Sequence, residues 1–172
     1  MKTKLIPIIV ATALMGSAHA QVGGIRFSAG YGWSGSIPNT TTGSSHLLGP
    51  ELIAELPAAH MTQVEFDFRA DVLLGGQLAR GSDLDGTVYR FLLIARTSVP
   101  GSKVSTFGGI GWGTAQARAG EFAGFSGMVN QIGLSFPLGI GSSGLAPTVE
   151  LASSIASRSG LSGYSLTIGL HF

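Results

Sequence analysis

A strict alternation of apolar and charged side chains runs through residues 64–74 and constrains the fold more than any other feature of the chain. The charged positions are Glu65, Asp67, Arg69 and Asp71, and a single apolar residue separates each from the next. Successive side chains of a β-strand point to opposite faces, so a strand gathers all four charges on one side. A helix would spread them around its circumference. The segment is therefore predicted to be a strand with one apolar and one charged face.

Seven further segments show the same period of two. In residues 25–37 one face carries Ile25, Phe27, Ala29, Tyr31, Trp33 and Ile37. The other predicted strands are residues 48–56, 89–96, 104–113, 128–136, 145–155 and 164–172. Residues 48–56 and 128–136 are less regular, and Asn130 interrupts the apolar face of the latter. The chain is therefore predicted to be all-β, with eight strands.

The connectors between these segments alternate in length. Long connectors are expected at 38–47, 75–86 and 114–125, and shorter ones at 57–62, 97–102 and 137–143. The connector at 157–161 breaks the pattern because it is short, although it belongs to the long-loop side. Long loops at one end and tight turns at the other are typical of an antiparallel up-and-down barrel. A single barrel accounts for the chain after its amino-terminal segment.

The amino terminus has the pattern of an export signal. Lys2 and Lys4 precede the apolar run Leu5–Met15, and Ala18-His19-Ala20 provides small residues around a cleavage point before Gln21. The apolar run is shorter than the roughly 20 residues that a membrane-spanning helix needs. We therefore expect residues 1–20 to be a cleaved signal peptide and residues 21–172 to form the barrel domain.

Composition excludes several classes of protein. Only 11% of the residues are charged, against about 25% in ordinary soluble domains. Without residues 1–20 the chain has eight cationic and nine acidic side chains, which is too few cations for a nucleic-acid-binding face. The chain has no cysteine, so a disulfide framework, a thiol nucleophile and a thiolate zinc site are all excluded.

The two faces of the predicted strands indicate which side of the barrel is apolar. The apolar faces carry bulky aliphatic and aromatic groups, which would overfill the space inside eight strands. Small and charged side chains fit that space if the charges are paired. We therefore predict a lumen ion-pair network with partners on the adjacent strands 64–74 and 89–96, where cross-strand neighbours face each other. Its members are Glu65, Asp67, Arg69, Asp71, Arg90 and Arg96.

An apolar outer surface favours a membrane location for this barrel. Tyr31, Trp33 and Trp112 fall toward the long-loop ends of their strands, where an aromatic girdle would lie at the level of the lipid headgroups. A soluble, lipocalin-like carrier would instead need polar outward faces, and the sequence contradicts that requirement. The predicted fold class is an eight-stranded antiparallel up-and-down transmembrane β-barrel.

The carboxy terminus carries a family resemblance. The last strand places Tyr164, Leu166, Ile168, Leu170 and the terminal Phe172 on one face, and residues 106–113 alternate glycine with bulky groups. Together with the export signal, these features resemble the small outer-membrane β-barrel proteins of Gram-negative bacteria, such as the barrel domain of outer membrane protein A. The resemblance implies an outer-membrane location and contacts with membrane lipid and lipopolysaccharide. It also implies handling by periplasmic chaperones, and recognition of the last strand by the barrel assembly machinery.

Two groups of residues, three alternate glycines and three histidines, do not have the spacing of a binding site. Gly109, Gly111 and Gly113 are spaced by two, with no helix start after them, so they do not form a phosphate-binding loop. We expect these glycines to thin the inner face and leave room for charged side chains from neighbouring strands. His46, His60 and His171 do not share a strand at ligand spacing, so we predict neither a metal site nor a bound cofactor.

Three functions remain open at this point. The principal prediction is a non-catalytic outer-membrane barrel with a structural, adhesive or envelope-maintenance role and a lumen filled by side chains. The first alternative is a lipid-A-modifying or proteolytic barrel enzyme centred on His46, with Ser44 or Ser45 and an acid such as Asp83 or Asp85. The second alternative is a narrow ion or water channel. Oligomeric state and any ligand of the long loops are left open by the sequence.

Overall fold

The computed structural model describes residues 24–39, 43–61, 63–75, 84–117, 122–138 and 146–171. These residues form ten β-strands and one short 3₁₀ helix, η1, at Ser159–Leu161. The strands are β1 (Arg26–Ser34), β2 (Ile37–Asn39), β3 (Gly43–Ser45), β4 (Leu48–Met61), β5 (Val64–Gly75), β6 (Gly86–Ser98), β7 (Ser105–Ala117), β8 (Phe125–Pro137), β9 (Ala146–Ala156) and β10 (Gly163–His171). Among the described residues, no helix is long and apolar enough to cross a membrane.

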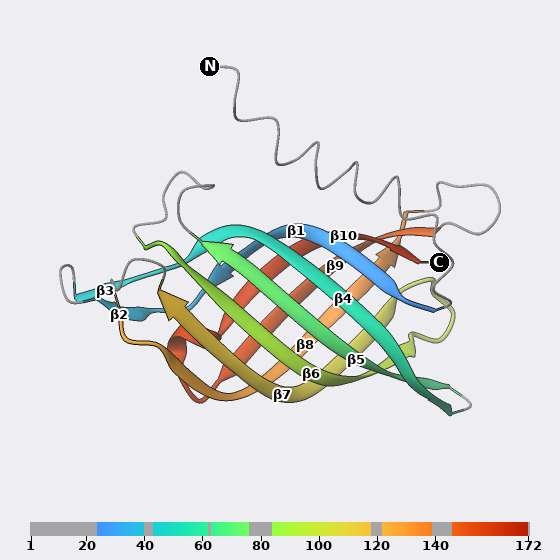
Figure 1. Cartoon of the computed structure of the whole chain (residues 1–172). Helices are drawn as coiled ribbons and strands as arrows, with labels where there is room; N and C mark the ends of the chain where they lie inside the picture. Colours follow the sequence, from blue (N-terminus) through green and yellow to red (C-terminus); the bar gives the residue numbers. More distant parts are fainter. Residues whose placement is uncertain are drawn as a thin grey trace, which may run out of the picture.

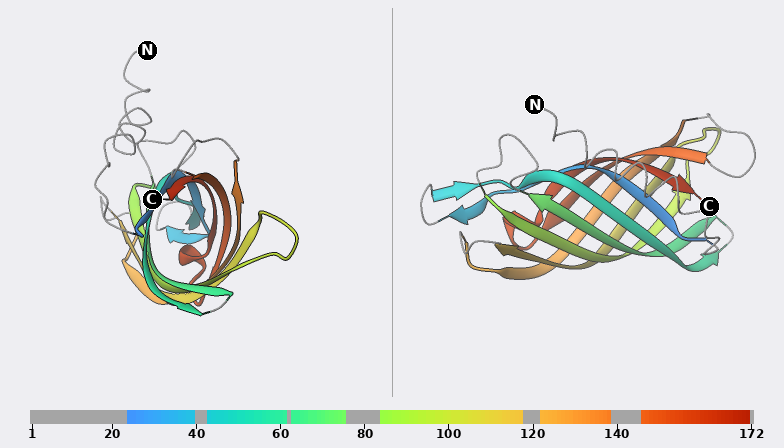
Figure 2. Two further views of the ribbon diagram at one scale, coloured as in Figure 1. Left: turned by 90° about the vertical axis from the view of Figure 1, so that its right-hand side faces the viewer. Right: turned by 45° about the horizontal axis from the view of Figure 1, so that its top comes forward.

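Eight of these ten strands close into one antiparallel barrel in the order β1-β10-β9-β8-β7-β6-β5-β4 (Figure 1). The first and last strands of the barrel are paired, with Trp33 opposite Tyr164, and β1 also pairs with β4, where Trp33 lies opposite Leu48. Closure pairs each of the eight strands on both edges, so the wall has no unpaired edge. The predicted eight-stranded antiparallel barrel is confirmed. Figure 2 shows this closed wall from one end and its tilted strands from the side.

β2 and β3 form a separate two-stranded hairpin at one end of the barrel (Figure 1). The prediction that Ile37 continues the outer face of the first strand is wrong, since β1 ends at Ser34 and the Ile37 side chain is fully buried. The chain leaves the barrel wall after Ser34, and Ile37 becomes part of a buried apolar cluster. We call the end of the barrel near this hairpin the loop end and the opposite end the turn end.

The structure also corrects the connector predicted at residues 57–62. β4 continues to Met61, which lies opposite Val64 of β5, so the connection between these strands shrinks to residues 62–63. The pairing passes an irregularity between Pro57 and Ala59. Proline lacks the amide hydrogen that a ladder requires, and the strand accommodates this by a local register shift instead of ending there.

The barrel is apolar outside and charged inside. Exposed side chains along the wall include Phe27, Leu52, Phe68, Phe91, Ile110, Ile132, Leu151 and Ile168. The buried side chains include Glu51, Glu55, Asp67, Arg69, Asp71, Arg90, Arg96 and Glu150. In water the reverse arrangement would be more stable, because burying charged groups is costly and large apolar side chains are stabilised by burial. This distribution suits a wall that faces hydrocarbon and an interior that satisfies its own charges.

Candidate functional site in the barrel lumen

Arg69 of β5 lies at the centre of a buried ion-pair network. Its side chain is fully buried, and its Nε donates a hydrogen bond to Asp71 Oδ1 at 2.7 Å. Its Nη1 donates both to Glu55 Oε1 on β4, at 3.0 Å, and to Glu150 on β9. Asp71 in turn accepts a 2.9 Å hydrogen bond from the amide of Gln131 on β8. Arg69 and its partner Asp71 therefore connect four strands of the wall.

Two further arginines extend the network toward the turn end. Arg96 of β6 donates from Nη2 to both carboxylate oxygens of Glu55, at 2.9 and 3.0 Å, and lies 3.4 Å from Glu150. Arg26 of β1 donates to Asp67 Oδ2 at 3.1 Å and pairs with Glu65. Charge-assisted hydrogen bonds of this kind allow ions to remain in a low-dielectric interior.

The structure places all six charges of the predicted network on the inner side of the wall, but their partners differ from those expected. Glu65 and Asp71 lie directly opposite Arg96 and Arg90 in the β5–β6 register. Glu65 nevertheless pairs with Arg26, and the only β5–β6 ion pair among the described residues is Arg96 to Asp67, at 4.0 Å. The long arginine side chains reach past their immediate neighbours and cross the lumen instead.

Four members of the network were missing from the predicted set: Arg26, Glu51, Glu55 and Glu150. Each stands at an inward-facing position of its strand, so the alternation of side chains along that strand could have identified it as a lumen residue. The sequence does not show which wall positions meet across the lumen, because that depends on how far each strand is staggered against the next.

Arg90 of β6 forms a further ion pair in the lumen, nearer the loop end. Its Nη1 donates a 2.9 Å hydrogen bond to Glu51 Oε1 on β4, and both side chains are almost fully buried. Its Nε donates to the main-chain carbonyl of Leu161 in η1, at 3.1 Å. The same guanidinium therefore satisfies an acid of the wall and holds in place the helix that turns into the barrel mouth.

Phe107 of β7 is a large aromatic side chain in the charged part of the lumen. Its ring centroid lies 5.1 Å from the guanidinium carbon of Arg69 and 4.8 Å from that of Arg96, within the range of cation–π attraction. The ring packs over Gly133 of β8, where any added Cβ would overlap it. Gly133 therefore leaves the space that Phe107 occupies beneath the two arginines.

The expected role of the β7 glycines needs correction. The space above Gly109 is occupied by Ile94, and that above Gly113 by Val129 and Leu161. The thinned inner face therefore receives apolar side chains, not the charged ones that we expected. The acids that pair with the arginines stand on β4, β5 and β9.

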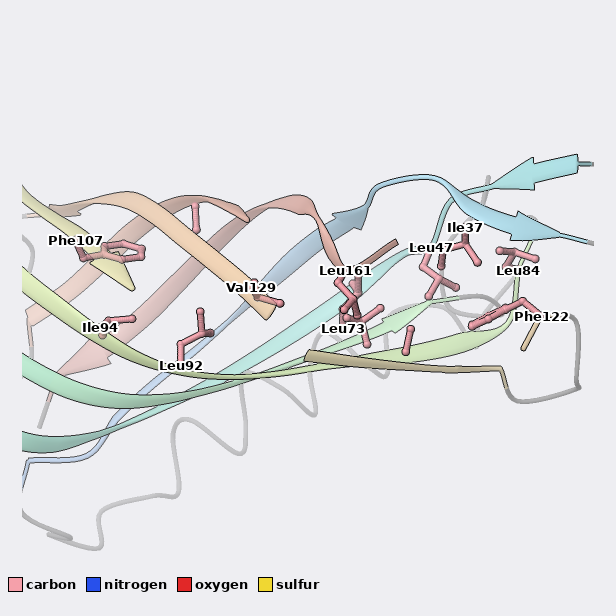
Figure 3. Packing of buried hydrophobic residues seen from close by; sticks show 13 residues of the cluster. Ile37, Leu47, Leu73, Leu84, Leu92, Ile94, Phe107, Phe122, Val129 and Leu161 are labelled. Atoms are coloured by element: carbon pink, nitrogen blue, oxygen red, sulfur yellow. The ribbon is translucent and has the colours of Figure 1, made fainter. Parts of the chain in front are cut away.

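An apolar cap fills the lumen at the loop end, and the sequence analysis did not anticipate it. Its residues are buried and come from both the wall and the connecting segments, as Figure 3 shows for most of them. They are Ile37, Leu47, Leu73, Leu84, Val88, Ala115, Phe122, Val129 and Leu161. A charged group buried among these residues would have no partner of opposite charge, which makes its burial costly.

The turn end is more open. A cavity of about 600 Å³ opens there, lined by His60, Glu65, Arg96, Lys103 and several hydroxyl groups from β6 to β9. A second, separate cavity, lined by residues that include Glu55, Arg96 and Glu150, has a volume of only about 10 Å³. The lumen is therefore a vestibule that ends at the ion-pair network, with the apolar cap behind it.

The aromatic residues predicted for a girdle point outward. Tyr31, Trp33 and Trp112 are all exposed on the wall, in the half of their strands nearer the loop end. Tyr164 stacks on Trp33, with ring centroids 5.8 Å apart. The two tryptophans and the tyrosines Tyr31, Tyr89 and Tyr164 all lie in this half, since Tyr89 is near the start of β6. Their assignment as a headgroup girdle stays a prediction.

Only part of the histidine-centred alternative falls on residues that the structure describes. His46 packs against Trp33, with ring centroids 5.2 Å apart, and its Nδ1 lies 3.2 Å from the Ser34 carbonyl oxygen. Asp83, one of its proposed partners, lies outside the described residues, as does the terminal Phe172 of the predicted assembly signal. Among the described residues no group of three or more histidine or acidic side chains is arranged to hold a metal.

Comparison with known proteins supports the fold. No family model matches the chain, and no curated protein matches it. Among solved structures, the chain superimposes on Neisserial surface protein A, NspA, with a TM-score of 0.53 and 12% identity, covering 86% of this chain and 95% of NspA.

Two other solved structures were also matched. Ail, the attachment invasion locus protein of Yersinia pestis, has a TM-score of 0.48 at 14% identity, covering 87% of this chain and 97% of Ail. The N-terminal β-barrel domain of OprF from Pseudomonas aeruginosa has a TM-score of 0.48 at 12% identity, covering 87% of this chain and 99% of that domain. The argument rests on the closed barrel, its inverted distribution of charge and the superposition with NspA. On these grounds the chain has the eight-stranded antiparallel barrel fold of the small outer-membrane β-barrel proteins.

Proposed function

We propose that this protein is an integral outer-membrane barrel with a structural, non-catalytic role, whose lumen is closed by its own side chains. The observation that supports the proposal is that two barriers lie one behind the other along the lumen. The network around Arg69 joins opposite walls, and the apolar cap around Leu161 fills the space behind it. A steady pore would need a continuous polar path.

The outer surface supports a lipid environment for this barrel. Leucine, isoleucine, phenylalanine and other large apolar side chains are exposed around the wall. An export signal in residues 1–20, contacts with lipopolysaccharide and insertion by the barrel assembly machinery belong to the same proposal. None of these partners is needed to explain the closed lumen itself.

A conductance measurement tests the proposal. Purified protein is refolded in detergent, checked for heat-modifiable gel migration, and added to planar lipid bilayers. We expect no steady conductance from the wild type. A variant with both barriers weakened, Arg69→Ala with Leu161→Ala, is expected to admit ions more often, because it removes the side chain that joins β4, β5 and β9 together with a large side chain of the apolar cap.

Leu151→Ala is the matched control, because Leu151 points outward from β9. Steady conductance by the wild type would overturn the closed-lumen proposal and move a small channel to first place. A monomer that needs no detergent to stay in solution would overturn the membrane location.

A further inference from the structure

Asn130 of β8 is a polar side chain in the middle of the apolar outer surface. It is exposed, and its neighbours across the ladder are Ile110 on β7 and Ile155 on β9. Along its own strand the next outward residues are Met128 and Ile132. All four of these side chains are exposed and apolar. The amide therefore lies inside the apolar belt, with an exposed apolar group before and after it on its own strand and opposite it on both neighbouring strands.

No described residue forms a hydrogen bond with the Asn130 side chain. A primary amide carries two donor hydrogens and an acceptor oxygen, and hydrocarbon offers a partner for neither. Outward-facing polar groups of this kind are costly in a bilayer unless another molecule satisfies them. The partner of this amide must therefore come from outside the barrel.

The surface next to Asn130 is also hollowed. A groove of about 400 Å³ crosses the outer wall from β10 to β7, and its lining includes Tyr164, Ser153, Leu151, Ile132, Leu134 and Thr106. Ile132, one of the lining residues, lies between two small residues, because its ladder neighbours are Gly108 and Ser153. The face therefore combines a protruding side chain, which is 61% exposed, with a recess beside it.

We propose that this β7–β9 face is an interface between two copies of the protein in the membrane. Two barrels inserted in the same direction are related by a two-fold axis along the membrane normal, so each residue lies at the same depth as its counterpart, and a residue near the axis contacts that counterpart. A primary amide is then self-complementary, since each copy donates to the other. The exposed Ile132 side chain and the groove that it lines offer apolar surface for the same contact, and membrane-embedded helices associate through close packing combined with polar hydrogen bonds.

Acyl chains could fill the groove, but they offer no hydrogen-bonding group to Asn130. A second copy satisfies both the amide and the groove, so it is the occupant that accounts for both observations. The inference rests on the membrane location proposed above, which heat-modifiable migration and recovery in the membrane fraction test separately.

Disulfide trapping in intact membranes tests this interface, and the absence of native cysteine makes single-cysteine variants straightforward. Ile155→Cys is the reporter, because Ile155 flanks Asn130 and is highly exposed. Leu52→Cys is the matched control, since Leu52 is exposed on β4, which lies opposite the Asn130 strand β8, four strands away in the barrel order. We expect oxidation to give a covalent dimer with Ile155→Cys and little or none with Leu52→Cys.

The role of the amide is tested by adding Asn130→Leu to the Ile155→Cys reporter. Loss of one interchain polar contact is expected to lower the trapped dimer about fivefold. Unchanged trapping would overturn the assigned role of Asn130. Equal trapping at Leu52 and Ile155, or none at either, in a protein that is heat-modifiable and membrane-bound would overturn the interface and leave lipid as the occupant of the groove.

Discussion

Arg69 on β5 donates a hydrogen bond to Glu150 on β9, the strand that lies four places away in the barrel order and so forms the opposite wall. The two residues are 81 positions apart in the chain. Together with the contact from Arg69 to Glu55 on β4, this pair joins three strands of the barrel through the lumen. The stability of the barrel therefore depends on ion pairs as well as on the ladder hydrogen bonds of the wall.

Arg69→Ala is expected to destabilise the barrel strongly. It leaves Asp71, Glu55 and Glu150 with less compensating charge in a buried space. Breaking a buried ion pair in this way costs about 3–5 kcal/mol. Urea unfolding of the refolded protein in lipid vesicles, followed by tryptophan fluorescence or gel migration, measures the change.

Glu150→Gln is the control for this prediction. The network holds four arginines and six acids, namely Glu51, Glu55, Glu65, Asp67, Asp71 and Glu150. Removing one acid leaves no arginine without a partner, and glutamine still accepts a hydrogen bond. A smaller loss of stability than for Arg69→Ala is expected, and an equal loss would contradict the charge argument.

Arg90 and Glu51 are expected to be energetically coupled. Arg90→Ala leaves a buried carboxylate at Glu51, whereas the double variant Arg90→Ala with Glu51→Gln leaves no isolated charge. The double variant should therefore be more stable than Arg90→Ala alone, by about 1–3 kcal/mol for contacting residues of one network. Additive effects in a double-mutant cycle measured by urea unfolding would contradict this coupling.

Phe107→Leu tests the contribution of the aromatic ring beneath the two arginines. Leucine keeps an apolar side chain over Gly133 but has no π-face for Arg69 and Arg96. A loss of about 1–2 kcal/mol is expected for the buried cation–π contacts. Phe91→Leu, at an exposed position of β6, serves as the control. Equal effects of the two substitutions on urea unfolding would mean that the ring acts only through its apolar area.

Deletion of Phe172 is expected to impair assembly more than stability. This expectation comes from the resemblance of the last strand to the terminal strands of outer-membrane barrels, in which a terminal aromatic is read by the assembly machinery. The deletion should lower the amount of protein in the outer membrane and leave a protease-sensitive chain in the periplasm. Normal surface levels, measured by membrane fractionation, would rule out the assembly role.

The alternation of residues 64–74 was enough to predict a strand with a charged inner face, and the same reasoning applied to every strand of the barrel. This works because side-chain direction in a strand is a local property that follows from the backbone pleat. The order of the strands followed from connector lengths, since short connectors join antiparallel neighbours. The inverted placement of charge also followed, because eight strands enclose too little space for bulky apolar faces.

The ion-pair partners could not be read from the sequence in the same way. Glu65 lies opposite Arg96 in the ladder but pairs with Arg26, which is 39 positions away. Which charges meet across the lumen depends on the stagger and tilt of all eight strands, a property of the closed barrel and of no single segment. A long arginine side chain then selects among several acids within its reach.

The apolar cap was likewise decided by the tertiary structure. Ile37 continues the alternation of the first strand and was assigned to the outer surface, whereas the folded chain turns after Ser34 and buries it with Leu161 and Phe122. These three residues come from separate connections between strands, and only barrel closure brings those connections to one mouth. Periodicity determines which way a side chain points from its strand, while the closed wall determines what it meets there.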